Sequence, residues 1–198
     1  MTHPLIPETN EFPASTRRLA YADITRPEVR HVWDGLGFVQ DNFFRMLAHA
    51  PTLVGALGSL VHGILGELEL DARHRELAIM HVNHVRNVRS TWAWHVDIAL
   101  TDGGISREQL FALQRGDIAS SIFSNDDRAV LRFVDELLLN GAVCDDSFEA
   151  VGARLSSRQL MELMIITGAY AMFGNIMETA EIQIEWESAD PLHLSPRH

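Results

Sequence analysis

The chain has 198 residues, 46% of them hydrophobic and 22% charged, which favours one globular domain with a sizeable core. Its formal net charge is −11, with 27 acidic side chains against 16 arginines and no lysine. This balance argues against binding to the phosphates of nucleic acid and to an anionic membrane surface.

The N-terminal segment MTHPLIPETNEFPAS has no basic stretch followed by an apolar one, so we expect no secretory signal. No apolar run reaches the roughly 18 to 20 residues of a membrane helix, and the single cysteine, Cys144, excludes an intrachain disulfide. We therefore expect a cytoplasmic protein with no membrane association. Residues 1–20 and 186–198 are polar and contain proline, which predicts an N-terminal arm, one domain over residues 21–185 and a C-terminal tail.

The first half of this domain is predicted to hold four helices. The first contains a glycine interruption, Pro51 opens the second, and Asp71 is a good N-cap for the third. The fourth is expected to end near the DGG sequence at 102–104. The predicted ranges are residues 27–50, 51–70, 71–87 and 87–100.

The second half is also predicted to be helical, over residues 106–116, 124–141, 145–155 and 156–180. Ser106 with Gln109 and Ser156 with Gln159 form capping boxes, and Gly141 ends a helix. The last helix is apolar on nearly every face, which predicts a central buried helix. Only EIQIEW (181–186) resembles a strand, and we expect it to be a helix end or an extended tail. The predicted fold class is therefore all-α.

The segment NVRSTWAWHVDIAL (87–100) concentrates aromatic and ionisable side chains in one predicted helix. On an ideal helix Thr91, Trp92 and His95 share a face, whereas Trp94 and Asp97 point elsewhere. This spacing predicts that Trp92 lines a pocket beside His95 and that Trp94 packs in the core or at an interface. The competing interpretation is a structural histidine in a packed core helix, which is the commoner role of a lone helical histidine.

Glu76 is the second candidate, because it enters the apolar stretch ELAIMHV. A carboxylate buried there must be paired or protonated, since an isolated buried charge is costly. One interpretation makes Glu76 a functional group. The other makes it a glutamate near the start of its helix that pairs with Arg73 or Arg75.

Ten histidines raise the question of a metal site. A simple antiparallel hairpin of residues 71–87 and 90–101, turning near Val88, would bring His81, His84 and His95 together as ligands. The sequence has neither an HExxH motif nor paired ExxH motifs, so we expect no metal. The same hairpin offsets Glu76 from His95 by roughly six residues, or about 9 Å. Direct contact would then require an oblique helix crossing or a neighbouring subunit.

From about residue 40 to 182 the chain resembles the carboxymuconolactone decarboxylase-like, or AhpD-like, superfamily. The resemblance lies in four ordered stretches: NFFRMLAHAPTL, RHRELAIMHVNHVRNVRSTWAWHVDIALTDGGISREQLFAL, DDRAVLRFVDELLLNGAVCDDSFEAV and LSSRQLMELMIITGAYAMFGNIM. It implies an AhpD-like helix bundle that assembles as a homo-oligomer, a trimer or a hexamer.

The redox branch of this superfamily combines a glutamate, a CxxC pair and a histidine four residues after the second cysteine. Glu76 and His95 match that spacing, but Val88 and Thr91 occupy the cysteine positions. Thiol peroxidases require a thiolate and a disulfide, so the redox function is not implied for this chain.

The branch without cysteines is closer in sequence. Trp92, His95, Gly168 and Tyr170 match its tryptophan, histidine and last-helix positions, whereas Ser90 and Thr91 replace its aromatic and acidic residues. This departure puts an acid role at position 91 in doubt.

The decarboxylase and isomerase relatives imply cofactor-free proton transfer or decarboxylation on a small organic acid or lactone. His95 would be the general acid/base, and Glu76 would orient it or act as the second proton-transfer group. The side chains expected to bind substrate are Val88, Thr91, Trp92 and Tyr170. Two alternatives remain: an AhpD-like antioxidant-family protein that has lost the CxxC pair, and a non-enzymatic oligomeric binder of small molecules.

Overall fold

The computed structural model describes residues 14–35, 41–184 and 190–193. Its internal contacts divide the chain into two compact units, Met1–Glu67 with Met177–Ser188, and Leu68–Ile176 with Ala189–His198. The described residues are helical and contain no β-strand beyond a single bridge between Ser15 and Ala20. The all-α prediction is therefore confirmed. Most residues of the predicted N-terminal arm and C-terminal tail lie outside the described residues, and these boundaries stay predictions.

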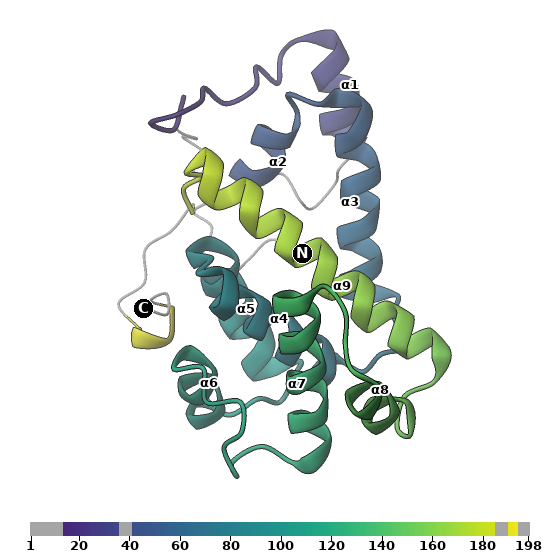
Figure 1. The fold of residues 1–198 in the computed structure, drawn as a ribbon. Helices are drawn as coiled ribbons and strands as arrows, with labels where there is room; N and C mark the ends of the chain where they lie inside the picture. The colour runs from purple at the N-terminus through teal and green to yellow at the C-terminus, as the bar shows by residue number, and fades with distance from the viewer. Residues whose placement is uncertain (1–13, 36–40, 185–189, 194–198) are drawn as a thin grey trace. The chain divides into compact units, whose positions relative to one another are not determined.

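The first unit contains α1 (Pro27–Gly35), α2 (Asn42–Leu47) and α3 (Pro51–Gly66), labelled in Figure 1. The predicted helix over 27–50 is thus two helices, and α3 begins at Pro51 as predicted. Asp41 caps α2 by accepting a hydrogen bond from the backbone N–H of Phe44. Both α1 and α2 pack against α3.

The second unit contains α4 (Ala72–Arg86), α5 (Arg89–Thr101), α6 (Arg107–Gln114), α7 (Asn125–Asn140) and α8 (Asp145–Gly152). The long helix α9 (Ser157–Ala180) begins in this unit, and the short 3₁₀ turn η1 (Pro191–His193) belongs to it. In Figure 1, α4 lies among the other helices, and α5, α6 and α7 each pack against it.

The helix ends in this unit follow their sequence signals. Asp71 accepts a hydrogen bond from the backbone N–H of His74 and caps α4. Both predicted capping boxes form, at the starts of α6 and α9. Gly141 ends α7 with a φ of 74°, a left-handed conformation that favours glycine.

Helix α9, predicted to be a central buried helix, is buried on part of its surface, and it also reaches the length of a membrane helix, which no apolar run was expected to reach. It buries Leu163, Ile166 and Phe173, but Met161 and Ile165 are exposed. Among the described helices, only α9 is long and apolar enough to cross a membrane, with a mean hydropathy of 1.4 over its most apolar part. Half of that part is buried inside the protein, so α9 serves here as a core helix.

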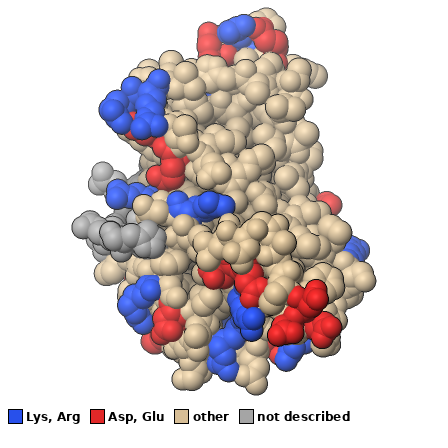
Figure 2. Space-filling model, in the orientation of Figure 1, with Lys and Arg blue, Asp and Glu red and all other residues tan. Residues whose placement is uncertain are grey.

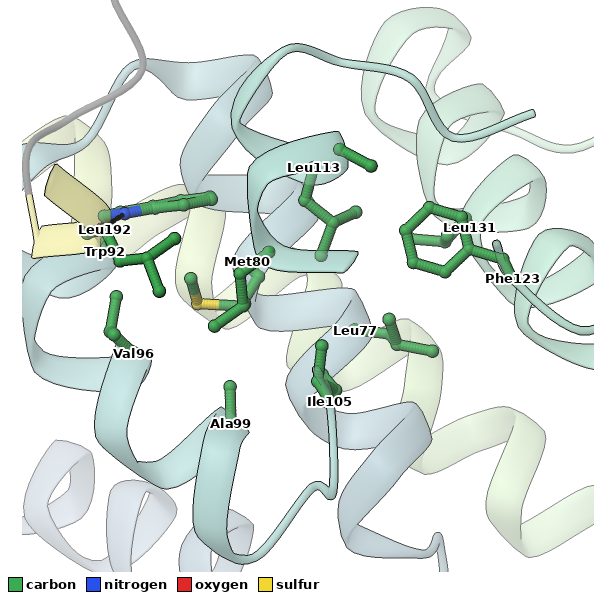
Figure 3. Packing of buried hydrophobic residues seen from close by; sticks show 12 residues of the cluster. Leu77, Met80, Trp92, Val96, Ala99, Ile105, Leu113, Phe123, Leu131 and Leu192 are labelled. Carbon is green, nitrogen blue, oxygen red and sulfur yellow. Dashed lines mark hydrogen bonds between the residues drawn. The ribbon is translucent and has the colours of Figure 1, made fainter. Parts of the chain in front are cut away.

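The core of the second unit is a cluster of side chains from α4, α5, α6, α7 and η1, shown in Figure 3. Trp92 and Leu192 lie together at one edge of it, and Met80, Leu77 and Ile105 continue it toward Leu131. The core thus recruits Leu192 from the C-terminal turn. On the face drawn in Figure 2, acidic and arginine side chains lie beside one another, as expected for a surface stabilised by local ion pairs.

Candidate active site

Three helices of the second unit bring Glu76, His95 and Tyr170 into one hydrogen-bonded chain. Glu76 lies on α4, His95 on α5 and Tyr170 on α9. Glu76 Oε2 lies 2.8 Å from His95 Nδ1, and Tyr170 Oη lies 3.0 Å from His95 Nε2. The rings of His95 and Tyr170 meet edge to face, with centroids 5.1 Å apart. Both ring nitrogens of His95 are therefore engaged.

This contact corrects the offset of about 9 Å expected for Glu76 and His95 in a simple hairpin. The two side chains meet within one chain, and no neighbouring subunit is needed. The register of a hairpin gives only the positions of backbone atoms along parallel axes. It omits the crossing of the helices and the reach of two long side chains.

Arg75 adds a positive charge to the same group. Its Nε lies 2.8 Å from Glu76 Oε1, so the carboxylate has a cation on one oxygen and the imidazole on the other. Glu76 thus pairs with Arg75, as the structural interpretation predicted, and also contacts His95, as the functional interpretation requires. Arg73, the other predicted partner, instead binds Asp127 at 2.9 Å.

Burial strengthens the electrostatic interactions among Glu76, His95 and Tyr170, because little solvent screens them. Glu76 is 0% exposed, Tyr170 3% and His95 5%. Burial alone would raise the pKa of Glu76, but the neighbouring His95 and Arg75, by charge and hydrogen bonds, hold it below its ordinary value. Burial and the nearby Glu76 carboxylate raise the pKa of Tyr170 well above its usual range.

These directions assign the protons. A Glu76 carboxylate can only accept, so Nδ1 of His95 carries the hydrogen and donates it. Tyr170 stays protonated, so wherever Nε2 of His95 carries no hydrogen the phenol O–H is its donor. The result is a directed chain from phenol to imidazole to carboxylate, in which the imidazole is held in one tautomer.

Gly103 is a supporting residue that the sequence patterns did not single out. A Cβ at this position would lie 2.9 Å from the carbonyl oxygen of Ala99 and 3.2 Å from Cβ of Glu76. Glycine is therefore needed where the chain leaves α5 and passes over Glu76. Its only sequence signal is the DGG turn, which predicted a helix end and nothing more.

Trp92, expected beside His95, lies in the core of the unit. It is 0% exposed, packs in the cluster with Val96 and Leu192, and donates its indole N–H to the carbonyl oxygen of Leu192 at 2.6 Å. Asp97 lies 3.5 Å from His193 of the same turn. The unusual composition of α5 thus serves two purposes. Trp92 and Asp97 contact the C-terminal turn η1, and His95 joins the hydrogen bonds with Glu76 and Tyr170.

The histidines considered as metal ligands are not brought together. His81 lies 2.9 Å from Asp135 and stacks with His84, whereas His95 contacts Glu76 and Tyr170. Within the described ranges, no three His, Cys, Asp or Glu side chains converge as a metal ion would require.

Solved structures share this arrangement of helices. The chain matches an uncharacterised peroxidase-related protein with an alkylhydroperoxidase AhpD core from Ralstonia eutropha JMP134, with a TM-score of 0.64 and 19% identity over 94% of this chain and 98% of that one. It also matches an uncharacterised peroxidase-related protein from Silicibacter sp. TM1040, with a TM-score of 0.63 and 18% identity over 92% and 94% of the two chains. A protein of unknown function from Agrobacterium tumefaciens, for which an antioxidant-defence role as AhpD has been suggested, matches with a TM-score of 0.61 and 21% identity over 69% and 93%.

The fold is AhpD-like. No family model and no curated protein sequence matches the chain, so the likeness is one of structure. At these identities it establishes the fold and leaves the chemistry to be argued from the side chains.

The two positions that the sequence resemblance matches to the redox cysteines, Val88 and Thr91, hold side chains with other contacts. Val88 is 0% exposed and packs against Gly174 of α9, where an added Cβ would lie 2.4 Å from Val88 Cγ2. Thr91 donates its hydroxyl to Oδ1 of Asn83 at 2.7 Å. Cys144 is exposed and precedes α8, so it replaces neither cysteine.

Proposed function

We propose that this AhpD-like protein is a carboxymuconolactone decarboxylase-like enzyme, which transfers a proton on a small organic acid or lactone without a cofactor. The observation that supports it is the buried chain of Glu76, His95 and Tyr170. A histidine with a carboxylate on Nδ1 is oriented and electrostatically supported as an acid/base at Nε2.

The chemistry follows from the proton positions. In a proton abstraction, the substrate C–H bond breaks, its electron pair stays on the substrate as an enolate, and the proton moves to Nε2 of His95. In a decarboxylation, the C–C bond breaks, CO₂ leaves, and the electron pair on carbon takes the Nε2 proton of an imidazolium His95, which becomes the neutral imidazole. Neither route requires an electron acceptor. Once Nε2 carries the abstracted proton, it no longer accepts from Tyr170, whose O–H then donates to the developing enolate oxygen.

Deuterium exchange from D₂O tests this proposal even where the product is not known. We expect the protein to introduce deuterium next to the carbonyl of levulinate, acetoacetate or γ-butyrolactone, as followed by proton NMR. His95→Gln and Glu76→Gln should lower the exchange rate about 100-fold or more. His81→Gln, which removes a different buried histidine paired with a carboxylate, should retain the wild-type rate. Exchange that persists in His95→Gln, or no exchange by the wild type, would contradict the proposal.

The first alternative is an antioxidant-family role, which the names of the solved relatives suggest for those proteins. The side chains at positions 88 and 91 disfavour thiol chemistry. Turnover of a hydroperoxide with a dithiol reductant would revive this role, and we expect none above the rate without protein.

The second alternative is an oligomeric binder of small molecules. It would gain if a ligand bound equally well to the wild type and to the variants Glu76→Ala and His95→Ala, with no reaction detected. We also propose that the protein is a cytoplasmic homo-oligomer, a trimer or hexamer. The exposed apolar side chains Met161, Ile165 and Met172 on α9 support this assembly, and light scattering after size-exclusion chromatography tests it.

A further inference from the structure

The corner between α4 and α5 contains a buried donor group without a partner. Asn83 is 0% exposed, and its Oδ1 accepts the hydroxyl hydrogen of Thr91 at 2.7 Å. Its amide nitrogen Nδ2 has no hydrogen-bond partner in the described part of the chain. Buried polar groups are nearly always hydrogen-bonded, because leaving one unpaired is costly. The unpaired buried amide therefore points to a partner from outside the chain.

The surroundings of this amide favour an anion. Thr91 lies in the first turn of the 13-residue helix α5, whose N-terminal end carries a partial positive charge. The N-cap residue Val88 supplies no side-chain hydrogen bond, and the first turn contains no acidic residue. Between Glu76 and Asp97 the sequence has no acidic side chain, whereas Arg86 and Arg89 flank the corner. In a chain of net charge −11, this stretch stands out as locally positive.

The same corner lies next to the candidate active site. Thr91 precedes His95 by one helical turn, or about 6 Å along the axis. Helix α9 runs along both positions, because Tyr170 contacts His95 and Gly174 contacts Val88. A small acid could therefore place its carboxylate at Asn83 and its reacting carbon near Nε2 of His95.

We propose that Asn83 and Thr91 form a carboxylate-binding subsite at the N-terminal end of α5. Asn83 donates one of its amide hydrogens to a carboxylate oxygen, and Thr91 orients the amide by donating to its oxygen. The chemical class of the ligand, a small organic acid, rests on the proposed function. The subsite itself rests on the unpaired amide.

The test measures binding separately from reaction. Levulinate is titrated into the full-length chain and followed by calorimetry and by the NMR shifts of the Asn83 side-chain amide. We expect saturable binding in the millimolar range or tighter, and about tenfold weaker binding of the uncharged methyl ester. Asn83→Leu should weaken levulinate binding about tenfold or more, and Thr91→Val should weaken it by a smaller factor.

The controls separate binding from folding. Asn87→Gly changes the same corner, at a residue with a φ of 53° where glycine is well tolerated, and should leave binding within about twofold of the wild type. Asn83→Leu removes an unpaired donor, which favours folding, and the hydrogen bond from Thr91, which opposes it, so the thermal unfolding temperature of the unliganded protein should stay near that of the wild type. If Asn83→Leu fails to fold, the amide shifts in the wild type and the binding by Thr91→Val decide.

The two proposals fail in different ways. Binding that depends on Asn83, without deuterium exchange, would support the subsite and overturn the acid/base function. Exchange with unchanged levulinate binding by Asn83→Leu would overturn the subsite alone. No binding of levulinate to the wild type, or equal binding of acid and ester, would also overturn it.

Discussion

The second unit contains two histidine–carboxylate pairs that look alike by distance and differ in their surroundings. Glu76 and His95 are 2.8 Å apart, and Asp135 and His81 are 2.9 Å apart. The Glu76 side chain is 0% exposed, whereas that of Asp135 is 31% exposed. Solvent therefore screens the second pair and leaves the first at nearly full strength.

The pairs also differ at the far side of the imidazole. Nε2 of His95 meets the phenol of Tyr170, whereas Nδ1 of His81 is buried with no hydrogen-bond partner among the described residues. The imidazole of His95 therefore has a hydrogen-bond partner on each ring nitrogen, whereas that of His81 has one on Nε2 alone among the described residues. The short distance between a histidine and a carboxylate does not by itself make a functional pair. The partner of the second ring nitrogen distinguishes the two pairs.

The largest expected effect comes from neutralising the buried carboxylate. Glu76→Gln removes the buried negative charge that faces both Arg75 and His95, so we expect the free energy of unfolding to fall by about 3 kcal/mol. Asp135→Asn is the matched variant in the screened pair, and its effect should be about 1 kcal/mol or less. Urea denaturation measures both. Equal losses would mean that exposure does not distinguish the pairs.

Overpacking at Gly174, one helical turn after Tyr170, should give the next largest effect without changing Glu76, His95 or Tyr170. Gly174→Ala places a Cβ against Val88, and such overpacking costs about 1 to 3 kcal/mol. Gly168→Ala on the same helix meets nothing within 4 Å and should be neutral or slightly stabilising. The double variant Gly174→Ala with Val88→Ala should recover part of the loss in thermal unfolding. Additive losses would show that the contact is not the cause.

Removing the phenol hydroxyl of Tyr170 should leave His95, like His81, with one ring nitrogen that has no hydrogen-bond partner among the described residues. Tyr170→Phe leaves Nε2 of His95 without its donor, and we expect about 1 kcal/mol lower stability. If the proposed function holds, the deuterium-exchange rate should fall more steeply than the stability. A wild-type exchange rate in Tyr170→Phe would remove the tyrosine from the mechanism.

The dependence of stability on pH should give the smallest and most specific difference. The folded-state pKa of Glu76 is lowered, so its contribution is complete above the ordinary glutamate pKa of about 4.5 and is lost as the pH falls through the lower folded value. The stability difference between wild type and Glu76→Gln should therefore shrink on acidification below that pKa. Denaturation curves from neutral to acidic pH measure this difference, and a gap that widens instead would contradict the assigned direction.

The helices and many of their ends could be predicted because their causes are local. Asp71, Ser106 and Gly141 each act on residues within a few positions, and each acts in the structure as its pattern indicates. The division of residues 27–50 into two helices follows the glycine interruption. The burial of α9 is less complete than its apolar composition predicts, because composition does not say how many neighbours a helix has.

The candidate site could be predicted in part. The spacing of Glu76 and His95 identified the pair through a resemblance, but the geometry of an ideal hairpin placed them apart. The contacts of Trp92 with Leu192 and of Asn83 with Thr91 depend on tertiary packing, for which the sequence has no periodic signal. The resemblance identifies Tyr170, but its hydrogen bond to His95 depends on how α9 packs against α5, which no local pattern encodes.

The bond from Trp92 to Leu192 joins two residues 100 positions apart and ties the C-terminal turn to the core. An indole N–H with such a strong acceptor should have its own resonance position in a nitrogen-edited NMR spectrum. That single proton then reports whether residues 190–193 are docked. Comparing its exchange with solvent with that of the α4 amides would show whether the turn opens on its own or only when the whole unit unfolds.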